Sequence, residues 1–272
     1  MDLQKVRRGE TGMKILIATD MEGITGVTTW EQVTPGHAEY ERFRKLMTQD
    51  VNAAVRGAYD AGADEVIVAD GHWNGSNILI EELDPRAVLN SGSPSPFAMM
   101  QGVDETIDGV MFVGYHARNG SPNAVLDHTW SSKRVANVWL NDILTGEYGL
   151  NAAVAGHFGV SVIMVSGDQT ACAQVTELLG DVETAIVKQA SGRFAAECLP
   201  PQVTQETICL SAQRAVERLA EGDTPDPFVL DTPITVTVEF FSSDMADRAT
   251  RIPFTKRAGT RVSFSAQEMV SA

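Results

Sequence analysis

The chain has little cysteine and no long apolar run. Its 272 residues include three cysteines, with neither a paired framework nor a two-residue CxxC spacing, which favours reduced core thiols in a cytoplasmic protein. No apolar stretch approaches the roughly 18 residues that a membrane helix requires. The first residues carry charge without an apolar segment, so we expect a disordered extension over residues 1–12 and no secretory signal.

Basic residues are also scarce. The sequence has 21 Lys and Arg against 36 Asp and Glu, a formal net charge of −15. A chain with this excess would repel the phosphates of nucleic acid rather than neutralise them, so we expect no nucleic-acid partner. The hydrophobic fraction of 43% is ordinary for a globular protein, and the length suffices for a large core in one large or two unequal domains.

Strand and helix signals alternate along the chain. The runs Lys14–Thr19, Glu65–Ala69 and Gly109–Val113 are rich in Ile and Val, as expected of strands buried on both faces of a parallel sheet. Between the first two, residues Ala38–Ala61 carry an apolar stripe at three- and four-residue steps, which predicts a helix. The pattern predicts an α/β fold, with a mostly parallel sheet flanked by helices.

The pattern of apolar and polar residues changes near residue 190. A long amphipathic helix at about residues 204–220 is followed by a proline-rich linker and the alternating run Ile234–Phe240, typical of a strand with one exposed face. We therefore predict an α/β metal-binding catalytic domain over residues 13–190 and a smaller, mixed α+β C-terminal lobe over residues 191–272.

Each of the three apolar runs ends in side chains that can bind metal. Asp20 and Glu22 follow the first run, His72 the second and His116 the third. The carboxyl ends of parallel strands meet at one edge of a sheet, where ligands bind in open α/β folds. Carboxylate oxygen combined with imidazole nitrogen suits Zn²⁺, Mn²⁺ or Co²⁺, so the pattern predicts a shared metal site.

Each candidate also has a structural alternative. Asp20 could cap the next element with Glu22 solvated, and a single histidine after a strand is often a hydrogen-bonded core residue. His128, in a loop, is either a surface histidine or a general acid/base or nucleophile beside the metals. Arg118 could meet a substrate carboxylate or form an ordinary ion pair. Glu147 opens a predicted helix, where the macrodipole alone would favour a carboxylate.

Taken in order, these motifs resemble the D-aminopeptidase family of cytoplasmic dizinc peptidases. The resemblance covers roughly residues 13–268, and although no single motif is decisive, five in register make a specific signal. They are Asp20-Met21-Glu22-Gly23-Ile24-Thr25-Gly26, Asp70-Gly71-His72, Gly114-Tyr115-His116-Ala117-Arg118, His128-Thr129 and Gly146-Glu147-Tyr148-Gly149-Leu150-Asn151-Ala152.

The resemblance implies roles that the spacing alone leaves open. It implies two zinc ions per subunit, a bridging role for Asp20, and His128 as the catalytic nucleophile or acid/base. The implied zinc ligands are Asp20, Glu22, His72, His116 and Glu147.

The expected activity is zinc-dependent hydrolysis of the N-terminal residue, of D configuration, from short peptides or amides. The resemblance further implies a ring-like homo-oligomer, a decamer of stacked pentamers. Two alternatives stay open on the residues alone: a dimetal phosphoesterase, which the scarcity of nearby Lys and Arg disfavours, and a non-catalytic zinc-binding homologue.

Overall fold

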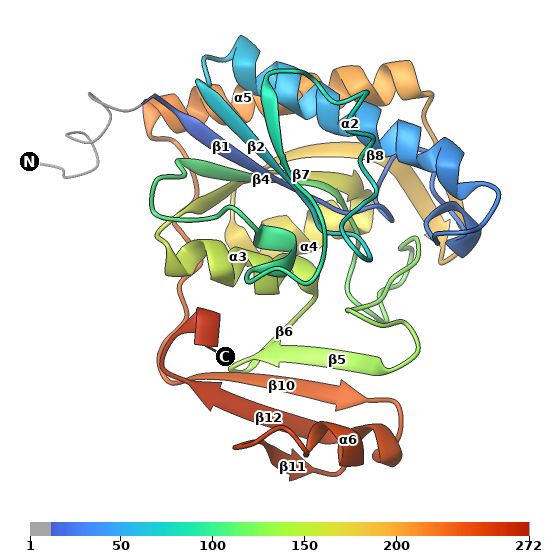
Figure 1. Cartoon of the computed structure of the whole chain (residues 1–272), viewed down its shortest axis with the longest axis vertical. Coiled ribbons are helices and arrows are strands. Elements are labelled where there is room, and N and C mark those ends of the chain that lie inside the picture. Colours follow the sequence, from blue (N-terminus) through green and yellow to red (C-terminus); the bar gives the residue numbers. More distant parts are fainter. Residues whose placement is uncertain (1–11, 272) are drawn as a thin grey trace, which may run out of the picture.

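A mostly parallel sheet of seven strands, sheet A, forms the centre of the structure, a computed structural model that describes residues 12–271 (Figure 1). Its strands are parallel except for the β8–β9 pair, which is antiparallel. In spatial order they are β3 (Ala87–Asn90), β2 (Glu65–Asp70), β1 (Lys14–Thr19), β4 (Gly109–Tyr115), β7 (Ser161–Asp168), β8 (Glu183–Gly192) and β9 (Ala195–Cys198).

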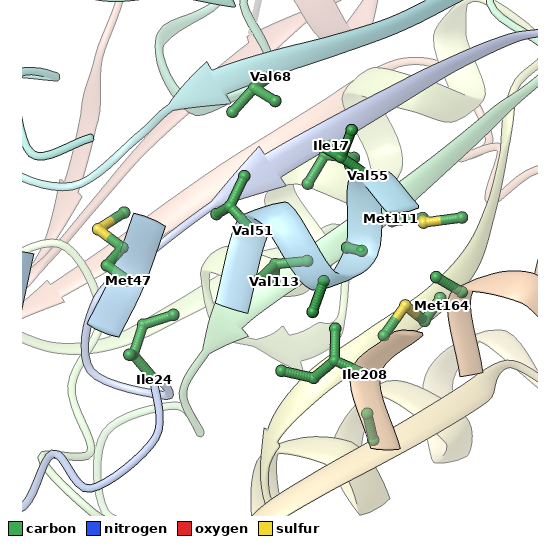
Figure 2. Packing of buried hydrophobic residues seen from close by; sticks show 14 of the residues in the cluster. Ile17, Ile24, Met47, Val51, Val55, Val68, Met111, Val113, Met164 and Ile208 are labelled. Atoms are coloured by element: carbon green, nitrogen blue, oxygen red, sulfur yellow. The ribbon is translucent and has the colours of Figure 1, made fainter. Parts of the chain in front are cut away.

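Helices cover both faces of sheet A. On one face, α2 (Tyr40–Asp60) and α5 (Pro201–Glu221) lie side by side over a cluster of buried aliphatic side chains, part of which Figure 2 shows. On the other face, α3 (Glu147–His157) and α4 (Gln169–Leu179) pack on a second cluster. Because both faces are covered, the central strands β1 and β4 are buried along most of their length, which explains their continuous apolar sequences.

A second, antiparallel sheet of five strands, sheet B, lies beyond α3 (Figure 1). A short helix, α6 (Ser243–Ala249), packs on it. The strands in spatial order are β11 (Lys256–Ala258), β12 (Arg261–Ala266), β10 (Ile234–Phe240), β5 (Val135–Leu140) and β6 (Ile143–Thr145).

The predicted fold class is confirmed: a mostly parallel sheet flanked by helices, with a smaller sheet beside it. The division of the chain at residue 190 stays a prediction. Sheet membership does not follow that division, because β5 and β6 join sheet B whereas β9 and α5 pack with sheet A. The predicted disorder of residues 1–12 falls, except for Gly12, outside the described residues.

The strand order places a switch point between β1 and β4. The chain runs outward from β1 through β2 to β3, then returns to the other side of β1 with β4. Connections at such a point diverge and leave a crevice beyond the carboxyl ends of the two strands. No helix in the described part of the chain combines the length and apolar character that a bilayer span needs.

Candidate metal centre

Two glycines bring the loop after β1 against the end of β4. A side chain on Gly23 would meet the Tyr115 carbonyl oxygen at 2.0 Å, and one on Gly114 would meet the Asp20 carbonyl oxygen at 2.2 Å. The close approach permits two backbone hydrogen bonds, from Asp20 N–H to Val113 O at 2.9 Å and from Gly23 N–H to Gly114 O at 2.8 Å. Glycine is therefore required at both positions, and the carboxylates of the loop lie beside the end of β4.

The first group of side chains comes from the ends of β1 and β2. The Nδ1 atom of His72 lies 3.0 Å from Oδ1 of Asp20 and 3.2 Å from Oε2 of Glu22. All three side chains are buried, and one ligand-type atom from each lies within 4.8 Å of the others. Their spacing suits one divalent cation at their centre.

The second group comes from the end of β4, the loop after it and the start of α3. The Nε2 atom of His116 lies 3.5 Å from Oε1 of Glu147, and Nε2 of His128 lies 3.8 Å from the same oxygen. The rings of His116 and His128 stack with their centroids 4.1 Å apart. These three residues form a second group with ligand-type atoms within 4.8 Å of one another.

Asp20 joins the two groups. Its Oδ1 faces His72, whereas its Oδ2 lies 3.4 Å from Nε2 of His116. Glu22 also reaches toward the second group, with Oε1 at 3.9 Å from Nε2 of His128. The six side chains therefore form one buried cluster.

All three histidines point one ring nitrogen into the cluster and the other at a backbone carbonyl. The outward nitrogens lie 2.7–2.9 Å from their carbonyl oxygens: His72 Nε2 at Val33 O, His116 Nδ1 at Ala117 O and His128 Nδ1 at Leu126 O. A carbonyl only accepts hydrogen bonds, so each outward nitrogen carries a proton. Metal-binding histidines are oriented in this way, because the outer hydrogen bond fixes which nitrogen offers its lone pair.

The carboxylates and imidazoles shift one another's pKa values. Burial alone would raise the pKa of Asp20, but the neighbouring imidazoles of His116 and His72 hold it well below its usual value. Burial likewise opposes charge on Glu147, yet His116 and His128 lower its pKa. Against their burial, His72 and His116 have raised pKa values, because Glu22 and Asp20 surround the first and Asp20 and Glu147 the second. The cluster thus favours the ionised forms of Asp20 and Glu147 and holds positive charge beside them.

Several buried polar atoms at the centre of the cluster lack a hydrogen bond. Among the described residues, these are Oδ2 of Asp20, Oε2 of Glu22 and Nε2 of His116. Leaving such groups unpaired inside a protein costs about 1–3 kcal/mol each, and more for charged groups. Divalent cations at the two groups would satisfy all three, and their preference for carboxylate oxygen and imidazole nitrogen matches the donor set.

The structure brings together all five predicted ligands and His128. The predicted separation of roles, with His128 outside the ligand set, stays a prediction, since its Nε2 lies in the cluster with the others. Arg118 is half-buried, and the one hydrogen bond that its guanidinium makes to the described residues is to the Asn119 carbonyl, at 3.4 Å. None of the ion pairs among the described residues includes Arg118, so its assignment to substrate also stays a prediction.

Sequence reasoning missed two groups that hold the cluster. The backbone N–H of Trp130 donates to Oε1 of Glu147 at 2.7 Å, a contact that no side-chain pattern could reveal. Lys188 lies inside β8, and its ammonium group binds the backbone of the loop after β1. The available signal for it was a lysine directly after the short apolar run Ala185–Val187.

Comparisons with known proteins agree with this geometry. A family model described as D-aminopeptidase matches residues 13–272. The D-aminopeptidase of Bacillus subtilis strain 168 is 37% identical over 268 residues, which cover 96% of this chain and 94% of the relative. The solved structure of the Zn-dependent D-aminopeptidase DppA from Bacillus subtilis, described as a self-compartmentalizing protease, superposes with a TM-score of 0.91. The two are 36% identical, and the match covers 95% of this chain and 93% of the other.

Proposed function

The chain belongs to the D-aminopeptidase family, and from this premise we propose that it is a zinc-dependent aminopeptidase. It would remove N-terminal residues, preferentially of D configuration, from short peptides or amides. The observation that carries the proposal is the buried cluster of carboxylates and imidazoles, in which three inward atoms lack a hydrogen bond among the described residues: Oδ2 of Asp20, Oε2 of Glu22 and Nε2 of His116. Membership of this family does not favour the phosphoesterase or the non-catalytic homologue.

The cluster fits two zinc ions. Asp20, Glu22 and His72 would hold one ion, and His116 with Glu147 the other. Asp20 suits a bridging role because its two oxygens face different histidines. When bound, the ions polarise the scissile carbonyl and lower the pKa of a water molecule toward about 7.

His128 would carry the proton that amide hydrolysis requires. Its Nδ1–H donates to the Leu126 carbonyl at 2.8 Å, which leaves the lone pair on Nε2 facing Glu22 and Glu147. That nitrogen can accept a proton during attack and return it to the leaving amine. Direct attack on the carbonyl would use the same lone pair, so a trapped acyl-imidazole would distinguish the nucleophile from the acid/base.

Arg118 would bind the carboxylate end of a short peptide. It lies two residues after His116, and no carboxylate of the described residues forms an ion pair with it. A substrate carboxylate would supply the charged partner that a guanidinium prefers. Arg118→Gln should raise KM for a dipeptide but leave KM unchanged for an amino-acid amide, which has no carboxylate. Arg134→Gln, at an exposed arginine, is the matched control.

We also propose a homo-oligomer, a decamer, in the cytoplasm. The solved relative is described as a self-compartmentalizing protease, which supports assembly, and an enclosed site would admit short peptides and exclude folded proteins. The segment beside sheet B offers apolar surface for a second copy, with Phe241, Ile252 and Phe254 exposed. Three free thiols support a reducing compartment. A monomer in light scattering under native conditions would contradict the assembly.

The direct test is a hydrolysis screen of the zinc-loaded protein. It should release the N-terminal residue from D-alanyl amides and dipeptides faster than from their L counterparts, and chelation should abolish the release. p-Nitrophenyl phosphate tests the alternative phosphoesterase activity. We expect no phosphate release, because among the described residues no Lys or Arg forms an ion pair with the three cluster carboxylates, whereas phosphate sites usually include such basic residues. Zinc-dependent phosphate release without peptide cleavage would overturn the proposal.

A further inference from the structure

Lys188 is a fully buried lysine whose ammonium group binds backbone carbonyls instead of a carboxylate. Its Nζ atom donates to Glu22 O at 2.6 Å, Ile24 O at 2.9 Å and Val27 O at 2.9 Å. An ammonium group has three N–H donors, so all three are used. The three acceptors belong to one segment, residues 20–27, which follows β1 and carries Asp20 and Glu22. We refer to this segment as the ligand loop.

Asp50 of α2 binds the same loop by accepting hydrogen bonds from Thr25. Its Oδ2 accepts the Thr25 backbone N–H at 2.9 Å, and its Oδ1 accepts the Thr25 hydroxyl at 3.0 Å. Like Lys188, Asp50 is buried. The ligand loop is therefore held by a cation from β8 and an anion from α2.

The ligand loop has few other polar anchors to the rest of the fold. Its first half is hydrogen-bonded to β4 through Asp20 N–H and Gly23 N–H. After Gly23, the polar contacts that tie its backbone to other described elements are those of Lys188 and Asp50. The Thr25 hydroxyl also lies 2.8 Å from Oγ1 of Thr204 in α5, and the side chain of Ile24 packs among the buried aliphatics of Figure 2. The Glu22 carbonyl lies where the two halves meet, so the ammonium bound there restrains a proposed ligand directly.

Keeping a charge in this position is costly. Burial lowers the pKa of Lys188 to about 8, which reflects the loss of water around the ammonium group. An apolar residue would avoid that cost but would remove a donor from three buried carbonyls, of which Ile24 O alone keeps another within the described residues, the Val27 N–H at 3.2 Å. A buried ammonium group of this kind is expected where a defined loop conformation matters more for function than the stability of the folded protein.

We propose that Lys188, assisted by Asp50, is a positioning residue that holds the ligand loop so that Glu22 and Asp20 face the metals. The proposal rests on the proposed zinc function and concerns one half of the cluster. Loss of Lys188 should therefore weaken the Asp20, Glu22 and His72 site more than the His116 and Glu147 site.

The test compares zinc titrations of the full-length protein and its variants. Lys188→Met keeps the length of the side chain without its charge, and it should weaken one of the two zinc sites by about 10–100-fold, the size of outer-shell effects. The other site should keep its affinity. Lys14→Met, at a lysine paired with Glu65 on the surface, and Val175→Ala, in the core on the opposite face, should leave both affinities unchanged.

Chemical rescue separates positioning from general stability. Lys188→Ala removes the part of the side chain that n-propylammonium would replace, so this ion should restore zinc affinity and turnover. Tetramethylammonium, which has no N–H donor, should not restore them. If neither Lys188 variant folds, Asp50→Asn tests the other anchor and should weaken the same zinc site.

Two outcomes would overturn the proposal in different ways. Folded Lys188→Met or Asp50→Asn protein that binds both zinc ions with wild-type affinity would refute the positioning role while leaving the zinc function intact. A wild-type protein that fails to take up two zinc ions would refute the zinc function and, with it, this inference.

Discussion

The carboxyl edge of sheet A carries two kinds of buried aspartate, and the contrast between them identifies the site. Asp168, at the end of β7, accepts N–H groups from Thr170 and Ala171 on Oδ1 and from Val125 on Oδ2. Asp20, after β1, is equally buried, but its Oδ2 has no hydrogen bond among the described residues. A carboxylate satisfied by the backbone is structural, whereas a buried carboxylate left with a free oxygen among imidazoles is suited to a cation.

The end of β2 shows the same contrast within three residues. Asp70 accepts hydrogen bonds from the backbone and side chain of Asn77 and from the Ile78 N–H, so both its oxygens are used. Two residues later, His72 directs Nδ1 at the carboxylates of the cluster. Asp70 therefore stabilises the loop after β2, and that loop directs His72 toward the cluster.

The largest effect is expected when a free carboxylate is removed. Asp20→Asn should lose most zinc from both sites, because Asp20 faces both groups. Turnover should fall further than the roughly 10²–10⁴-fold expected for loss of a proton-transfer group. Metal analysis by mass spectrometry, alongside amide hydrolysis, measures both. If Asp20→Asn kept two zinc ions per chain, Asp20 would not differ from Asp168 as a metal ligand, and the distinction between the two aspartates would be wrong.

The next largest effect is expected at His128. His128→Ala should lower turnover by about 10²–10⁴-fold while the protein keeps its zinc, because positioned proton transfer contributes an amount of that size. His116→Ala is the matched variant and should lose metal together with activity. Parallel loss of zinc and activity in His128→Ala would instead identify His128 as a ligand, which its position 3.8 Å from Glu147 permits.

Asp50 offers a test through pH. Burial raises its pKa to about 6 in the folded protein, against an ordinary value of 3.8, so between these values the folded state binds more protons than the unfolded chain. The stability that Asp50 contributes therefore falls as pH rises from 4 to 7, by about 3 kcal/mol. Urea unfolding of zinc-free wild type and Asp50→Asn should show this difference in their pH dependence. Parallel curves for the two proteins would contradict it.

The smallest effect is expected at the satisfied aspartate. Asp168→Asn keeps an oxygen for the N-terminus of α4 but turns an NH₂ group toward the Val125 N–H. The free energy of unfolding should fall by about 1–2 kcal/mol, and both zinc ions should stay. Thermal unfolding and metal analysis check these outcomes. Zinc loss equal to that of Asp20→Asn would erase the distinction between the two aspartates.

The parallel core and four of the six side chains of the site, Asp20, Glu22, His72 and His116, could be predicted from local sequence. Continuous apolar runs predict buried parallel strands, and parallel strands deliver Asp20, His72 and His116 to one edge. Glu147 and His128 could not be assigned from spacing, because a glutamate that opens a helix and a histidine in a loop have ordinary structural explanations. Their assignment required the family resemblance.

Long-range pairing escaped the sequence reasoning. In sheet B, Val138 of β5 pairs with Val238 of β10, and no local pattern specifies a partner one hundred residues away. The edge strands β3 and β9 are four residues each and lack a clear apolar alternation. The satisfied state of Asp70 and Asp168 also depends on backbone N–H groups from other segments, so sequence alone could not separate them from Asp20.

Anomalous diffraction at the zinc absorption edge, from crystals of the zinc-loaded protein, tests the central claim most directly. We expect two peaks in the buried cluster, one among Asp20, Glu22 and His72 and one beside His116 and Glu147, with Asp20 touching both. Zinc peaks confined to surface residues, or a cluster that stays without zinc while the protein hydrolyses D-alanyl amides, would contradict it.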